Sequence, residues 1–269
     1  MFEICKTNWL PEDVEIHQDI VKIRCKLSLS EKHLMTQVFN YLPKKTQSLY
    51  KKYEEEERFF TIASFLEAKH LYTYEYLFRN FQIAPVPLRR HQEFQEIQHR
   101  NKFLSNDSLH CNYSIAKNLA MTALYRENLE YYTSFIILSN LKMKGLSEIL
   151  LFIMEDKKNI SKECAKIFNS FKNRIHIQEE LEEDIYDSIQ LAISNEFTYI
   201  DCIFEDIHLP NLTTHQLKNY VLWRASKNLK EIGIEKAIPL APEKNPIEWF
   251  DSEYFEAPIT QCINEESDE

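Results

Sequence analysis

The chain has 269 residues, 44% of them hydrophobic and 28% charged, a balance typical of a soluble globular protein that can bury a core. Its formal net charge of −10 argues against a nucleic-acid groove, which would require clustered lysine and arginine. Only two glycines occur, which argues against turn-rich β architectures and indicates an all-α protein.

The six cysteines contain no Cys-x-x-Cys pair and are widely spaced, a pattern typical of a reducing compartment. The N-terminus carries acidic residues and a tryptophan where a secretory signal would have a basic and then an apolar stretch. No apolar run reaches the about 18 residues that span a bilayer. We therefore expect a cytoplasmic protein that contacts neither membrane nor nucleic acid.

In chain order, the sequence predicts three regions. Residues 1–30 form an irregular N-terminal arm in which Trp9 is an aromatic anchor and Pro11 begins a helix. Residues 31–238 form a helical bundle, and residues 239–269 an extended, acidic C-terminal tail. Apolar spacing and the positions of proline and glycine predict helices over 30–42, 47–82, 113–143, 146–171, 179–206 and 213–232. Gly145 and Gly233 are expected just past the ends of two of these helices.

The helix expected over residues 47–82 carries a Glu-x-x-His pair, Glu67 and His70, followed one turn later by Tyr74. This spacing places all three side chains on one face of the helix. In bundle-core metal sites, two helices each supply such a pair and two others supply one acid each. The stretch therefore predicts half of a dinuclear metal site, with a chance pair and an ordinary packed tyrosine as the alternative.

Several segments resemble, in the same order, the radical-generating small subunit of class I ribonucleotide reductases, a family of ferritin-like helical bundles. The resemblance implies a subunit of ribonucleoside-diphosphate reductase, an oxidoreductase that reduces ribonucleotides to deoxyribonucleotides. The implied partners are the large subunit of the reductase and a second small subunit, in a homodimer or a heterodimer. The segments span nearly the whole chain and are Trp9–Glu15, Glu31–His33, Glu67–Tyr74, Glu127–Phe135, Ile153–Asp156, Trp223–Gly233 and Asn245–Trp249.

The same resemblance implies roles for individual residues. Family members hold a di-iron or manganese centre, and the matching ligands here are Glu67, His70 and Glu127. Tyr74 matches the radical tyrosine. Trp9 and Asp156, together with His70, match the hydrogen-bonded route that moves an electron and a proton between the tyrosine and the large subunit.

Three of the family's six ligand positions are changed: Thr46, Lys157 and Ile160 stand where the family has an acid, a glutamate and a histidine. Two carboxylates and a lysine leave a site of net charge about −1, which under-neutralises two divalent ions. Lys157 could instead place its ammonium between Glu67 and Glu127 as a buried ion pair. We therefore expect the metal centre to be absent, mononuclear or weakly bound.

Two mechanisms remain open within this resemblance. The chain is either a degenerate partner of a competent small subunit, or it carries a metal-independent tyrosyl-type radical with Lys157 neutralising the emptied site. A non-catalytic ferritin-like scaffold or binding protein is the alternative from another functional class.

Overall fold

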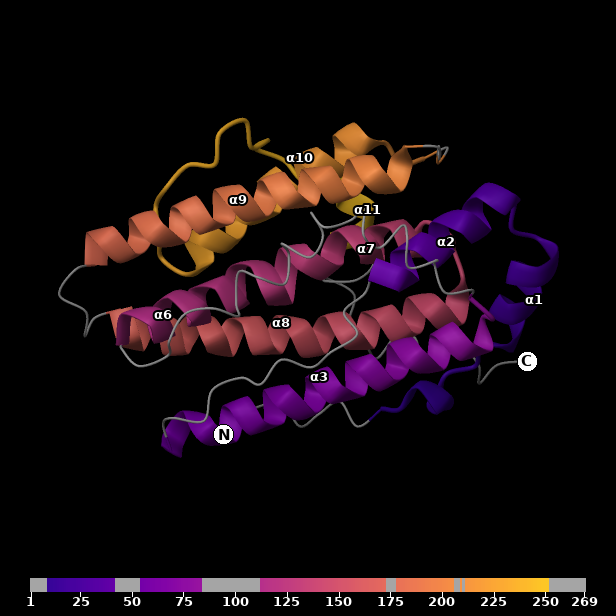
Figure 1. Ribbon diagram of the computed structural model, residues 1–269, viewed down its shortest axis with the longest axis horizontal. Helices are drawn as coiled ribbons and strands as arrows, with labels where there is room; N and C mark the ends of the chain where they lie inside the picture. Colours follow the sequence, from indigo (N-terminus) through magenta and orange to yellow (C-terminus); the bar gives the residue numbers. More distant parts are fainter. Residues whose placement is uncertain are drawn as a thin grey trace, which may run out of the picture.

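The computed structural model describes residues 9–41, 54–83, 112–172, 178–205, 209 and 211–251. Every regular element in these ranges is helical, apart from one isolated bridge between Leu209 and Leu212. The predicted all-α architecture is therefore confirmed (Figure 1). None of the helices in the same ranges combines the length and apolarity needed to cross a bilayer.

The bundle consists of long helical rods that lie side by side (Figure 1). α8 lies between α3 on one side and a composite rod, built from three consecutive helical segments, on the other. α9 and α10 cover the far side of the composite rod. The bounds are Glu54–Asn80 (α3), Asn112–Met121 (α6), Thr122–Leu129 (η3), Glu130–Ser139 (α7), Lys144–Lys172 (α8), Gln178–Phe204 (α9) and Thr214–Glu231 (α10).

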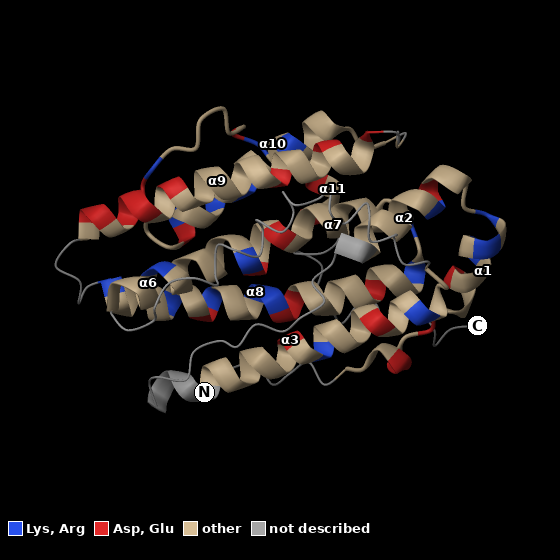
Figure 2. Ribbon diagram, viewed as in Figure 1, with Lys and Arg blue, Asp and Glu red and all other residues tan. Residues whose placement is uncertain are grey.

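Within the composite rod, η3 is a π-helical stretch that joins α6 to α7 without a break. The sequence predicts one long helix here, and the structure agrees except for this wider segment. Acidic residues gather at the start of α9 (Figure 2), where their negative charge stabilises the helix by interacting with the positive end of its dipole.

The last predicted helix, α10, has the ends that its sequence indicates. Thr213 caps its N-terminus by accepting a hydrogen bond from the Gln216 backbone N–H at 3.2 Å. Gly233 follows its C-terminus with φ +75°, a conformation that favours glycine. The short helix α11 (Glu248–Asp251) ends the described part of the tail.

The expectation of an irregular N-terminal arm is wrong for residues 17–25. After a short 3-10 turn at Pro11–Asp13, the arm forms helix α1 (His17–Cys25), and α2 (Leu29–Tyr41) follows. α1 packs Ile23 into the core and buries Asp19, whose carboxylate accepts the Leu146 backbone N–H at 2.7 Å. This contact with the start of α8 is tertiary, which is why the local pattern does not reveal the helix.

Gly145 also lies elsewhere than predicted. It is in the first turn of α8, and the preceding turn is made by Lys142 with φ +50°. A Cβ at position 145 would lie 2.5 Å from the Glu15 carbonyl oxygen and 2.9 Å from Asp19 Oδ2. Glycine is therefore required by the close approach of the N-terminal arm, not by the end of a helix.

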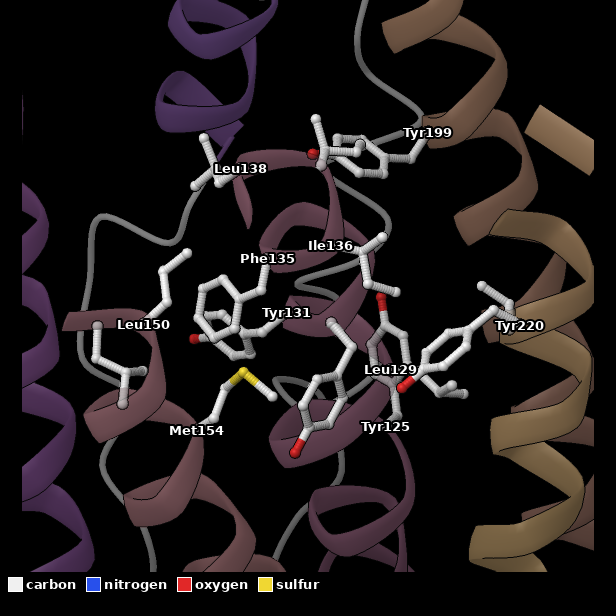
Figure 3. Close-up of a cluster of buried hydrophobic side chains, with 14 of the residues drawn as sticks. Tyr125, Leu129, Tyr131, Phe135, Ile136, Leu138, Leu150, Met154, Tyr199 and Tyr220 are labelled. Carbon is white, nitrogen blue, oxygen red and sulfur yellow. The ribbon is translucent and has the colours of Figure 1, made fainter. Parts of the chain in front are cut away.

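The core between α8 and the composite rod is rich in aromatic rings. Figure 3 shows the rings of Tyr131 and Phe135 beside Leu150 and Met154. Tyr131 and Phe135 are in contact, with ring centroids 5.9 Å apart. The Tyr131 ring also contacts the ammonium of Lys157, a buried polar residue of α8.

Candidate functional site

A polar interior collects side chains from three helices. α3 supplies Glu67 and His70, η3 supplies Glu127, and α8 supplies Asp156 and Lys157. Each of these residues is at most 5% exposed. Charged groups as deeply buried as these are stable only when they are paired and hydrogen-bonded.

The Lys157 ammonium lies between the two glutamates. Its Nζ is 2.9 Å from Glu67 Oε1 and 3.1 Å from Glu127 Oε2. This is the position that charge counting on the sequence suggests for Lys157. The carboxylates that match family ligands are thus held together by a cation belonging to the chain itself.

A second cation, Arg126, completes this cluster. Its Nη2 lies 3.3 Å from Glu67 Oε2, and its Nε lies 3.6 Å from Glu127 Oε1. Adjacent residues of an α-helix point about 100° apart. Arg126 and Glu127 lie within the π-helical η3, whose eight residues are all buried, so both can face the same interior. We call Glu67, Arg126, Glu127 and Lys157 the ion-pair cluster.

The cluster fixes the protonation of its members. Burial alone would raise the pKa of Glu67, but the Lys157 ammonium, His70 and the Arg126 guanidinium outweigh it and hold that pKa well below the usual 4.5. Burial would lower the pKa of Lys157, yet the Glu127 and Glu67 carboxylates raise it. Burial and the Glu67 charge raise the pKa of Glu127 against the opposing pull of both cations. Lys157 is therefore an ammonium ion at neutral pH.

Tyr74 lies beside the cluster as a neutral phenol. Its hydroxyl is buried and makes no hydrogen bond to any residue that the structure describes. Burial, followed by the charges of Glu67 and Glu127, raises the pKa of Tyr74 well above 10. The neighbouring Tyr131 ring packs against the Lys157 ammonium, with Nζ 3.5 Å from the ring centroid.

Next to the ion-pair cluster, His70 and Lys69 share one carboxylate, that of Asp156. His70 Nε2 and Lys69 Nζ lie 3.0 Å and 2.9 Å from Asp156 Oδ2. His70 Nδ1 is 3.7 Å from Glu67 Oε1 and makes no hydrogen bond within the described residues. The imidazole is therefore bonded to Asp156 and not to the glutamates.

Trp9 lies at the outer end of this group. Its ring stacks on Phe152 with centroids 5.3 Å apart, and Lys69 Nζ lies 4.2 Å from the ring centroid. Trp9 Nε1 is buried and has no hydrogen-bond partner in the described part of the chain. The structure thus places Trp9, His70 and Asp156 in one group. The resemblance implies a hydrogen-bonded route through these residues, and the Lys69 ammonium lies where that route would need a direct hydrogen bond from the indole to the carboxylate.

Of the changed ligand positions, Ile160 is fully buried in α8, and Thr46 lies outside the described residues. Sequence reasoning missed Arg126 and Lys69. Arg126 directly precedes the candidate ligand Glu127, and Lys69 directly precedes His70. In both cases the sequence places a cation directly before a candidate ligand, which could have indicated a cation in the site. Regular α-helical spacing argues against this, because it places neighbouring residues on different faces of the helix.

The described residues of the polar interior do not fit a dinuclear metal centre. The described residues contain no group of three His, Cys, Asp or Glu side chains that could hold an ion. Two carboxylates and two cations make the ion-pair cluster neutral when all four groups are charged, and a divalent ion there would be repelled by Lys157 and Arg126 at short range. Metal ligation would also require displacing a buried ammonium from both acids.

Comparison with known proteins gives a consistent result. A model of the family "Ribonucleotide reductase, small chain" matches residues 2–246. The chain is 23% identical to "Ribonucleoside-diphosphate reductase subunit beta" of Chlamydia pneumoniae, covering 96% of this chain and 84% of that protein. It is 20% identical to a protein of Invertebrate iridescent virus 3 named "Probable ribonucleoside-diphosphate reductase small subunit 048L", over 91% of this chain and 73% of that one.

The fold has solved counterparts. A structure described as "Ribonucleotide reductase R2 subunit from Clostridium botulinum" superposes with a TM-score of 0.71 at 20% identity, covering 91% of this chain and 83% of that one. Agreement over this length shows that the helices are arranged as in that ferritin-like bundle.

Proposed function

Because this chain belongs to the ribonucleotide reductase small-chain family, as a class I small subunit, we propose that it is a metal-free structural partner within that enzyme. It pairs in the cytoplasm with a metal-loaded small subunit, and the pair works with the large subunit to reduce ribonucleotides to deoxyribonucleotides. The metal-loaded partner supplies the oxidising chemistry, and this chain supplies a rigid bundle of matching shape.

One observation carries the proposal: the Lys157 ammonium bonds both Glu67 and Glu127 inside the bundle. Both acids are at most 5% exposed, so neither is free to exchange the ammonium for water. Removing one partner of such a buried pair typically costs about 3–5 kcal/mol. The pairing therefore favours a closed, metal-free interior.

The surroundings of Tyr74 support the same conclusion. The phenol can lose an electron easily only if its proton moves to a nearby base. Its hydroxyl has no hydrogen-bonded acceptor among the described residues, and the Glu67 and Glu127 charges are already matched by Lys157 and Arg126. The chain's own residues thus hold Tyr74 in its protonated, reduced form.

The test is reconstitution. The chain is purified, incubated with Fe²⁺ or Mn²⁺ and oxygen, and assayed with the large subunit for deoxyribonucleotide formation, alone and together with a complete small subunit from the same host. We expect less than 0.1 metal ion per chain and no activity alone, and higher activity of the complete small subunit when this chain is added. Activity alone with about two metal ions bound per chain would refute the proposal.

A second function, a metal-independent radical on Tyr74, is favoured by one observation. Tyr74 is buried, with 7% of the residue exposed, which would shield an oxidised ring from most water. An electron paramagnetic resonance signal from metal-stripped protein that disappears in Tyr74→Phe would establish it and exclude the structural partner. Failure to bind any reductase subunit would exclude both and leave a scaffold of other function.

A further inference from the structure

Lys69 occupies an unusual position between a tryptophan and an acid. Its ammonium lies 4.2 Å from the centroid of the Trp9 ring and 2.9 Å from Asp156 Oδ2. All three residues are at most 8% exposed, so water does not separate them. The ammonium therefore touches the face of the indole and the carboxylate at once.

A cation against an indole face stabilises the reduced ring. The face of the neutral ring carries negative charge density, which attracts the Lys69 ammonium. When the ring loses an electron it becomes positive, and the attraction turns into repulsion. Burial weakens screening, so this repulsion stays strong. Lys69 thus makes removal of an electron from Trp9 harder.

Among the described residues, Trp9 also lacks a base that could take the proton of its oxidised indole. An indole radical cation becomes a neutral radical when its N–H proton passes to a base. Trp9 Nε1 has no hydrogen-bond acceptor in the described ranges. Asp156 Oδ2, the carboxylate oxygen that Lys69 contacts, is already bonded to Lys69 and His70. The proton therefore stays on the ring, and so does the positive charge.

We propose that Lys69 is a positioning residue that keeps Trp9 reduced and at the same time pins the N-terminal arm to α3 and α8. The ammonium substitutes for the indole N–H as the partner of Asp156. The biological role of Lys69 rests on the proposed function. In a structural partner, a Trp9 that resists oxidation would not take the oxidising equivalent away from the metal-loaded subunit.

The test measures oxidation of Trp9 in the isolated full-length chain. Flash excitation of tris(bipyridine)ruthenium(II) with persulfate gives ruthenium(III), which takes one electron from the indole, returns to ruthenium(II) and leaves the radical cation. The rate that belongs to Trp9 is the difference between each protein and its Trp9→Phe counterpart. This subtraction removes the contributions of Trp223 and Trp249.

Lys69→Met keeps the side-chain length and removes the charge, and we expect Trp9 to be oxidised about tenfold faster, which corresponds to ~1.4 kcal/mol. Lys69→Arg keeps a cation over the ring and should return the rate to within about twofold of the original. Lys166→Met is the matched control, an exposed α8 lysine about 21 Å along the helix from Phe152, and should change nothing.

A Lys69→Met rate equal to that of the original chain, in protein with an unchanged circular dichroism spectrum, would overturn the inference. If Lys69→Met does not fold, transient absorption of the original chain decides. The radical cation of Trp9 should persist longer than that of a tryptophan in water. Deprotonation as fast as that of tryptophan in water would show that Trp9 has a proton acceptor and would overturn the inference. No reductase subunit takes part, so these outcomes are independent of reconstitution.

Discussion

Replacing Lys157 with methionine removes the central cation of the ion-pair cluster with little change in volume. Glu67 and Glu127 would then face each other with Arg126 alone, at distances of 3.3 Å and 3.6 Å. Breaking a buried pair in this way costs about 3–5 kcal/mol. For a domain of this size, that loss lowers the melting temperature by roughly 10 °C.

The assay is urea and thermal unfolding followed by circular dichroism. Lys158→Met is the matched control, because Lys158 is the next residue of α8, is partly exposed and pairs with Glu155 at 3.5 Å. We expect this control to stay within about 0.5 kcal/mol of the original chain. The double variant Lys157→Met/Glu127→Gln should recover part of the loss, because it removes the one carboxylate charge that Arg126 leaves unmatched.

The same variant has a defined pH signature. The pKa of Glu67 is lowered below 4.5, so its contribution to the free energy of unfolding is complete above about pH 4.5 and is lost as the pH falls through the lowered value. The pKa of Lys157 is raised above 10.5, so its contribution is complete below about pH 10.5 and is lost as the pH rises through the raised value. Lys157→Met should reduce both dependences. A variant as stable as the original chain at pH 7, with the same acid limb, would refute the pairing.

Three further changes test other parts of the structure. Gly145→Ala should destabilise the fold by about 1–3 kcal/mol in urea unfolding, because its Cβ would meet the Glu15 carbonyl oxygen at 2.5 Å; an unchanged midpoint would contradict that contact. Thr213→Ala should cost about 1 kcal/mol in the same assay through loss of the α10 cap, and a cost near zero would show that the cap contributes nothing. Lys157→Glu leaves three acids facing Arg126, so calorimetric titration should detect one Mn²⁺ per chain in the variant and none in the original; equal binding by both would mean that Lys157 does not exclude metal.

The long helices could be predicted because apolar spacing, prolines and caps are local signals. Thr213 and Gly233 mark the ends of α10 both in the sequence and in the structure. α1 and the role of Gly145 could not be predicted, because both depend on a contact between the N-terminal arm and α8. Spacing within one segment contains no information about which distant segment will pack against it.

The candidate site could be predicted in part. Charge counting offers an ion pair of Lys157 with Glu67 and Glu127 as one outcome and a solvent-facing lysine as the other, and the structure has the ion pair. The position of Arg126 in the site could not be predicted, because it depends on the π-helical η3, and no residue pattern in the sequence indicates a π-helix there. Lys69 required knowledge of where Trp9 packs, and its presence leaves the indole N–H outside the hydrogen-bonded route that the resemblance implied.

The bond between Asp19 and the Leu146 backbone N–H also bears on how the chain folds. It joins residues 127 positions apart, at the first turn of the longest helix in the described ranges. The opening amides of that helix have no partner within it, and Asp19 satisfies one of them from the far end of the chain. Contacts with such long sequence separation form late and slow the approach to the native state. Docking of the first helix should therefore be among the last events of folding, and a chain shortened past residue 19 should begin α8 with a frayed turn.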